Sequence, residues 1–241
     1  MKKVTWILCS LILLATAPMM AQDFNKLKKS VGEKLGTSGA KGLSQEEVAE
    51  GLKEALSKGV EKGVEQLSKP DGYFKDLEIK IPLPAEARAV EDKLRQLGQD
   101  KLVDQAIESL NRAAEDAASG AKDIFIVAIK SMTLTDAISI LRGEDNAATN
   151  FLAKATRAAL VEKFKPVVST SLEKVGATKH WNTVFSTYNK IPLVQKVNPD
   201  LEDYATNKAI DGLFVQIAKQ ELEIRKNPAA RVTDLLKKVF G

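Results

Sequence analysis

A stretch near the C-terminus, residues 198–226, has the pattern of one long helix with two apolar faces. At about 100° per residue, its large apolar residues fall on two roughly opposite arcs. The first arc holds Ile210, Leu213, Phe214, Ile217 and Ile224, and the second holds Leu201, Tyr204, Val215 and Leu222. A surface helix needs only one apolar stripe. We therefore expect a helix that is packed on both sides and around which the domain is arranged. Asn198 and Pro199 predict its start, as cap and first-turn residue.

The rest of the chain supplies amphipathic helices to cover both faces. Aromatic residues make up 5% of the 241 residues, while Ala, Leu, Lys and Glu are abundant, which favours helix. Ser44 and Glu47 predict a capping box for a helix that ends near Leu67. The most apolar run, residues 124–129, fits a buried strand or a buried helix; we favour helix because strand partners are scarce. Further helices are expected from Pro84 to a stop at Gly98, from Asp100, from Thr133 to Gly143, from Asp145 or Asn146 with a bend or restart at Pro166, around Trp181 to Tyr188, and after Asn227.

The expected fold is therefore all-α: a single domain of about eight to ten helices around the two-sided helix near the C-terminus. Short extended segments are expected where Ile-Pro-Leu occurs, at residues 81–83 and 191–193. Residues 77–81 alternate apolar and charged side chains, which predicts that the extended conformation begins at Leu77.

Small residues recur every four positions along the first predicted helix, at Gly51, Ala55, Gly59 and Gly63. Each glycine costs about 1 kcal/mol of helix stability relative to alanine. A compensating benefit is expected, and the close approach of a neighbouring helix supplies one. Gly212, between the two arcs of the helix near the C-terminus, predicts a similar close crossing.

The first 21 residues have the features of a signal peptide. Basic residues at Lys2 and Lys3 precede an apolar stretch that is too short to span a bilayer comfortably, and Ala21 offers a cleavage point before Gln22. An uncleaved N-terminal anchor is the alternative. The predicted organisation is a signal peptide at 1–21, a flexible arm rich in Lys and Gly at 22–43, and a helical domain at 44–241. The expected location is the periplasm.

Cleavage would remove two lysines and the only cysteine, Cys9, so the formal charge would fall from +4 to +2. A mature chain so close to neutral is unlike a nucleic-acid binder, which shows a strongly basic face. Without cysteine, disulfides and thiolate metal sites are excluded. We expect no nucleic-acid partner, no cofactor, no metal and no membrane-spanning segment in the mature chain.

No common catalytic motif occurs in the sequence, and His180 is the only histidine. We interpret it as a packing or capping residue beside Trp181. Lys208 and Asp211 are one polar pair placed where burial is expected, three residues apart. One interpretation is a ligand-binding or catalytic pair in a helix-lined pocket, joined by Arg112. The other, which we favour, is a structural ion pair.

Several short sequences are similar to those of a bacterial family. They include Gly42-Leu43-Ser44, Ile81-Pro82-Leu83-Pro84, Leu110-Asn111-Arg112-Ala113-Ala114-Glu115, Ile140-Leu141-Arg142-Gly143 and Lys208-Ala209-Ile210-Asp211-Gly212-Leu213-Phe214. Together they resemble the exported family catalogued as domain of unknown function four-one-nine-seven, from about Gly42 to the end of the chain. The resemblance implies an export signal and a helical domain, and it assigns no activity and no catalytic residue.

Three functional hypotheses follow. The leading one is a non-enzymatic binding module of the cell envelope, which takes a partner protein or an apolar ligand between its helices. The second is an enzyme with a helix-lined pocket around Lys208 and Asp211. The third is a peripheral membrane protein that touches anionic lipid through the basic arm; we favour a solvated linker there, because Asp23 and Glu33 dilute the lysines.

Overall fold

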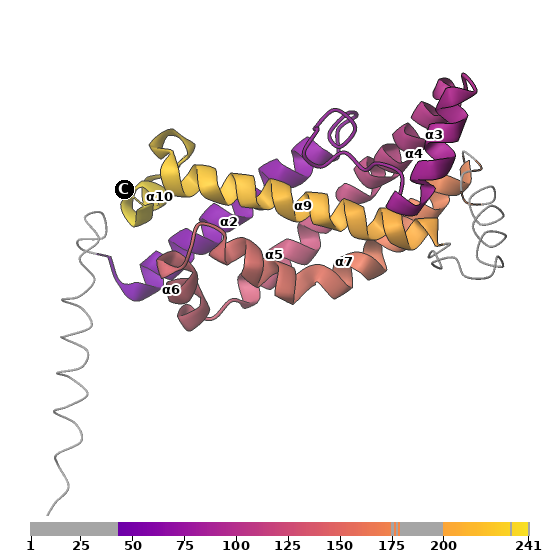
Figure 1. Ribbon diagram of the computed structural model, residues 1–241. Coiled ribbons are helices and arrows are strands. Elements are labelled where there is room, and N and C mark those ends of the chain that lie inside the picture. The colour runs from indigo at the N-terminus through magenta and orange to yellow at the C-terminus, as the bar shows by residue number, and fades with distance from the viewer. Residues whose placement is uncertain (1–42, 175, 177, 179–199, 232, 241) are drawn as a thin grey trace, which may run out of the picture.

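Helix α9 (Leu201–Lys226) runs along the length of the molecule and packs against helices α7, α2 and α4 (Figure 1). The structure is a computed structural model that describes residues 43–174, 176, 178, 200–231 and 233–240. These residues form one all-α domain with no strand. The remaining helices are α2 (Gln45–Leu67), α3 (Arg88–Gln96), α4 (Asp100–Ala118), α5 (Ala121–Ser131), α6 (Leu134–Arg142), α7 (Ala147–Lys174) and α10 (Asp234–Phe240), with single 3-10 turns at η1 (Ala85–Ala87) and η2 (Pro228–Ala230).

The two-sided packing predicted for α9 is confirmed, but its second face differs from the prediction. All five residues of the first apolar arc are buried. On the second arc Leu201 is buried, Tyr204 and Val215 are half-buried, and Leu222 is 40% exposed. The second packed face consists instead of small and amide side chains: Ala205, Ala209, Gly212, Gln216 and Gln220. These residues let α2 and the chain that follows it lie close to α9, so hydrophobicity alone does not identify this face.

The start of α9 is also corrected. The helix begins at Leu201, and Asp200 is its cap, with the Asp200 side chain accepting a hydrogen bond from the Asp203 amide at 2.8 Å. Asn198 and Pro199, which the sequence pattern favours, lie outside the described residues. Residues 1–42, His180, the expected helix at 181–188 and the Ile-Pro-Leu sequence at 191–193 also lie outside them. The predictions made for these four parts of the chain stay untested.

Most other helix boundaries are confirmed. Ser44 with Glu47 and Thr133 with Asp136 form capping boxes at the starts of α2 and α6. The apolar run at 124–129 is helical, within α5. Gly98 ends α3 in the left-handed conformation, with φ of +73°. Of the two alternatives expected at Pro166, the restart is wrong: α7 continues through it, packed against α4, α5 and α9. The bend stays a prediction.

The loop between α2 and η1, residues 68–84, corrects the prediction of an extended conformation from Leu77. Residues 77–79 form a turn, in which the main-chain amides of Ile79 and Lys80 donate to the Asp76 carbonyl oxygen at 3.2 and 2.8 Å. Ile79 and Ile81 are buried while Leu77 is 90% exposed. The alternation of side chains therefore reflects a turn and the chain after it, from which Ile79 and Ile81 reach the core while Leu77 does not.

Gly63 of α2 and Gly212 of α9 both lie at contacts of α9, but the space around their Cα atoms differs. At Gly63 of α2, an added Cβ would lie 3.6 Å from Gln216 Cγ, which is ordinary contact. At Gly212 of α9, an added Cβ would lie 2.7 Å from Tyr73 Cε1 and 3.2 Å from Ile79 Cβ. The close approach predicted at Gly212 is therefore made by the 68–84 loop, whose ring and branched side chain need the missing Cβ.

Replacing Gly212 by alanine is expected to destabilise the domain by about 1–3 kcal/mol, because the buried Tyr73 ring has to move. Gly63→Ala is the matched control in a helix of the same interface. It is expected to be neutral or to stabilise by up to about 1 kcal/mol, since it relieves the helix penalty of glycine. The measurement is urea unfolding of both variants, and equal stability of the two would contradict the close approach.

Candidate functional site

A groove of about 1000 Å³ opens at the end of the molecule where α3 and α4 lie. Its described walls come from α3, α4, the last turn of α7 and the first residue of α9, together with Leu83, Ala87 of η1 and Gly176. Aliphatic side chains form most of the lining: Leu83, Val90, Leu94, Leu102, Leu110 and Leu201, with Val103 and alanines 87, 106 and 113 between them. Val90 and Leu102 are 42% and 54% exposed, so the walls near the mouth of the groove present apolar surface to solvent.

The groove lies beside a hairpin of α3 and α4, in which α4 also packs on α7 and α9 while α3 packs on α4 and η1. Gly98 makes the reversal possible, and the Gln99 amide donates to the Leu94 carbonyl oxygen at 2.9 Å to close the end of α3. Arg95 of α3 then ties the two helices together through Asp100 and Asp104, at 3.3 and 2.9 Å. These bonds lie near the hairpin turn, so the apolar sides of α3 and α4 remain available to line the groove.

The charged side chains around the groove differ in how their charges are balanced. Glu91 is held by Arg95 at 3.1 Å, and Asp116 accepts a hydrogen bond from Ser171 Oγ at 2.8 Å. Arg112 bonds three carboxylates, those of Glu115, Asp71 and Glu108, and the first two of these bonds contribute most to raising the pKa of Arg112 above its ordinary value. Lys174 is exposed and forms no ion pair with any carboxylate that the structure describes.

A buried carboxylate on α4 holds the 68–84 loop against the core. Glu115 Oε1 accepts hydrogen bonds from the amides of Tyr73 and Phe74, at 3.0 and 3.1 Å, while its Oε2 accepts one from Arg112 at 2.7 Å. Asp71, whose φ of +71° is in the left-handed region, bonds the same arginine at 2.8 Å. The network turns the chain sharply and brings Tyr73 into the core, where it is fully buried.

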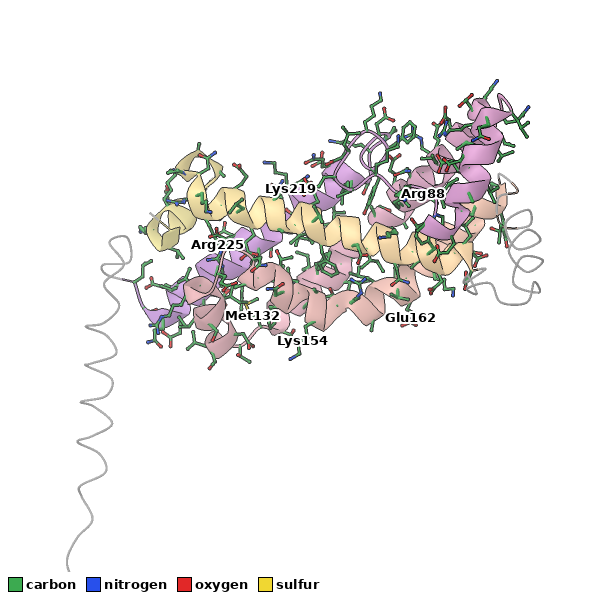
Figure 2. The ribbon with its side chains drawn as sticks, in the orientation of Figure 1. Arg88, Met132, Lys154, Glu162, Lys219 and Arg225 are labelled. Carbon is green, nitrogen blue, oxygen red and sulfur yellow. The ribbon has the colours of Figure 1, made fainter. Side chains whose placement is uncertain are left out.

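Other polar side chains fix the remainder of the 68–84 loop. Asn111 bonds both main-chain groups of Ile81, accepting from its amide at 2.8 Å and donating to its carbonyl oxygen at 2.9 Å. The Tyr73 hydroxyl donates to the Ala209 carbonyl oxygen at 2.7 Å, and burial raises its pKa so that it remains a neutral donor. Lys219 of α9 (Figure 2) reaches Asp76 and Glu78 of the loop at 3.3 and 2.9 Å. These contacts assign the loop a structural role.

A second buried carboxylate caps α7 from a distance. Glu221 of α9 accepts hydrogen bonds from the amides of Ala148 and Thr149, at 3.0 and 2.8 Å, and from the Thr149 hydroxyl at 2.8 Å. Arg225 bonds Glu221 and also the Ile140 carbonyl oxygen at the end of α6. The cap of α7 therefore includes a residue more than seventy positions away in the sequence, and the pair joins three helices in one place.

The structure does not bring together the residues proposed for a catalytic pocket. Lys208 is exposed, and Asp211 is exposed and bonded to Arg157 of α7 at 2.5 Å. Arg112 is engaged by the carboxylates of α4 and the 68–84 loop. The burial expected for Lys208 and Asp211 is wrong, because both lie on the part of α9 that neither α2 nor the loop covers. Neither lines the groove.

The stripe of small residues on α2 faces the interior, as Gly51, Ala55, Gly59 and Gly63 are all buried. Gly59 and Gly63 lie against Gln216, Gln220 and Ile224 of α9. A Cβ at either glycine would meet its neighbours at 3.4 Å or more. This part of the stripe therefore marks where α2 crosses α9, at a spacing that alanine would also allow.

Sequence reasoning missed the two buried glutamates, although signals for both exist. Glu115 lies in a run of alanines, residues 113–118, in which every position except Asp116 is buried. Glu221 occupies the gap in the first apolar arc of α9, four residues after Ile217 and three before Ile224. A lone carboxylate among buried positions of a helix indicates that it has a partner elsewhere in the chain. The sequence around the carboxylate does not show which residue that partner is.

Two negative findings apply to the described part of the chain. No group of three or more His, Cys, Asp or Glu side chains there could hold a metal ion. No single described helix is long and apolar enough to cross a membrane, and α5 with α6 meets that length and composition test only as a pair bent by 104°.

The sequence matches the family described as "Protein of unknown function (DUF4197)" over residues 42–241. The chain belongs to the DUF4197 family. No curated protein and no solved structure matches it. Membership covers the whole helical domain, including the groove and both buried glutamates, and it brings no activity with it.

Replacing Glu115 by alanine is expected to destabilise the domain by about 3 kcal/mol, because two loop amides and one face of Arg112 lose their acceptor. Glu108→Ala removes a more exposed partner of the same arginine and is expected to cost less than about 1 kcal/mol. Chemical denaturation gives both values, and hydrogen exchange at the Tyr73 amide reports the loop. Equal effects of the two substitutions would show that Glu115 does not hold the loop.

Proposed function

We propose that the chain is a non-enzymatic binding protein that holds an apolar small molecule in the groove between α3, α4, α7 and α9. The observation that carries the proposal is the groove, whose volume of about 1000 Å³ and largely aliphatic lining are those of ligand sites in proteins. Exposed apolar walls are costly to keep in water, and a ligand that covers them offsets that cost.

The polar groups near the groove support binding better than catalysis. Glu91, Glu108 and Arg112 are committed to ion pairs, and Asp116 is bonded to Ser171. A general acid or base needs a side chain with a shifted pKa directed at the reacting atoms. The hydrogen bonds to Glu115 and Asp71 raise the pKa of Arg112, so this side chain stays charged and does not exchange a proton at neutral pH.

A partner protein is the alternative occupant of the same groove. A small molecule is favoured because the lining belongs to a concave site, whereas protein partners commonly bury larger and flatter areas. The test separates the two, since a bound small molecule adds a small defined mass.

We propose further that the protein acts after export to the periplasm, supported by the signal-peptide features of residues 1–21. Protein recovered from a periplasmic extract is expected to begin at Gln22, which intact-mass measurement checks directly. An unprocessed chain that starts at Met1 and fractionates with membranes would show an uncleaved anchor instead.

An apolar fluorescent probe is expected to bind the purified helical domain and to become brighter on transfer from water. Ala106→Trp places a large side chain in the groove and is expected to weaken probe binding by about 1–3 kcal/mol. Ala158→Trp, on an exposed position of α7 outside the groove, is the matched control and leaves binding unchanged. Native mass spectrometry of the protein from periplasm identifies the natural ligand. Failure of the probe to bind the parent protein would refute the proposal.

A further inference from the structure

The lining of the groove restricts the shape of its ligand. None of the described lining residues carries an aromatic ring; they are leucine, valine and alanine with polar side chains at the rim. Sites for planar ring systems generally include aromatic side chains that stack on the ligand. The described part of the lining has no preferred stacking plane, and it suits a flexible hydrocarbon chain.

The groove follows α4 for most of the length of that helix. Its lining on α4 extends from Leu102 to Asp116, which at the rise of an α-helix is about 21 Å. Leu94 and Val90 of α3 line the opposite wall. A site this long beside one helix fits an extended chain better than a compact molecule.

Three of the polar lining residues lie where α4 and α7 end. Asp116, Ser171 and Lys174 lie on neighbouring turns there, with Asp116 and Ser171 bonded to each other at 2.8 Å. Lys174 is the cation of the rim that no described carboxylate holds, in contrast to Arg112 with its three partners. Residues 175–199, which follow Lys174 in the sequence, contain no aspartate or glutamate. An ammonium group at one end of an apolar groove is complementary to an anionic head.

We infer that the ligand is a single aliphatic chain with an acidic head group, as in a fatty acid, with the chain along α4 and the head at Lys174. This inference rests on the proposed function and names its ligand class. Lysine at the last residue of α7 also suits the negative end of the helix. That role alone predicts no effect of Lys174 on ligand binding, so binding measurements distinguish the two.

The experiment compares three ligands with the same chain, dodecanoate, dodecan-1-ol and dodecylamine, by displacement of the apolar probe. Dodecanoate is expected to bind about tenfold more tightly than dodecan-1-ol, the value of one hydrogen-bonded charge. Lys174→Gln is expected to remove this advantage and to leave binding of the alcohol unchanged. Lys154→Gln is the control, an exposed lysine on the same helix that lies outside the groove (Figure 2); it is expected to change neither.

A series from octanoate to hexadecanoate tests the aliphatic part. Affinity is expected to rise about fourfold for each added methylene until the groove is filled, and then to level off. A planar aromatic acid of similar size is expected to bind more weakly than dodecanoate. Tighter binding of the aromatic acid would overturn the inference that the ligand is aliphatic.

The outcomes separate this inference from the proposed function. If dodecan-1-ol or dodecylamine binds as tightly as dodecanoate and Lys174→Gln has no effect, the protein binds apolar ligands but the acidic head is wrong. If the probe itself does not bind, both the proposed function and the inference are refuted. If the probe binds but none of the three ligands displaces it, the inference is refuted.

Discussion

A buried main-chain amide that has no acceptor within its own helix must find one elsewhere. Two buried glutamates supply these acceptors here. Glu115 serves the amides of Tyr73 and Phe74, and Glu221 serves those at the start of α7. Each carboxylate is itself balanced by an arginine one turn away on its own helix, Arg112 or Arg225. The path of the 68–84 loop and the relative positions of α6, α7 and α9 depend on these acceptors. An amide or carboxylate left without a partner in the core would destabilise the fold by more than the packing around it stabilises it.

The same arrangement explains why the groove is separate from the most strongly bonded part of the molecule. Around Glu115 and Glu221 the polar groups are paired and the apolar side chains are covered. At the other end, α3 packs on α4 and η1 alone among the described elements with extensive contacts, and Arg95 ties it to α4 near their connecting turn. The apolar sides of the two helices beyond that turn are therefore left to form walls, and the ligand proposed above would act as the missing core at that end.

Much of the helical structure could be predicted from the sequence because helix ends and apolar faces are local. The capping boxes at Ser44 and Thr133 and the stop at Gly98 needed no knowledge of distant residues, and the helix at 124–129 needed only the scarcity of strand partners. Two of the misplaced features depend on partners far along the chain. Leu77 to Ile81 alternates like an extended segment but is folded by contacts with α4 and α9, and Asp211 finds its partner on α7. The groove could not be predicted, because its described lining comes from elements far apart in the sequence, from Leu83 to Leu201.

The contacts of α2 determine when folding can be completed. This helix is the first of the described domain, yet its main partners are α9, α5, α6 and α10, two of which lie at the C-terminal end of the chain. Tyr73, just after α2, bonds a carbonyl group 136 residues later. Closing such long loops must precede the contacts that stabilise them, so the contact of α2 with α9 carries a larger loop-closure cost than contacts between neighbouring helices. During synthesis the part of α2 that packs on α9 and α10 stays uncovered until these last two helices have emerged, whereas α5 and α6 can cover their part earlier.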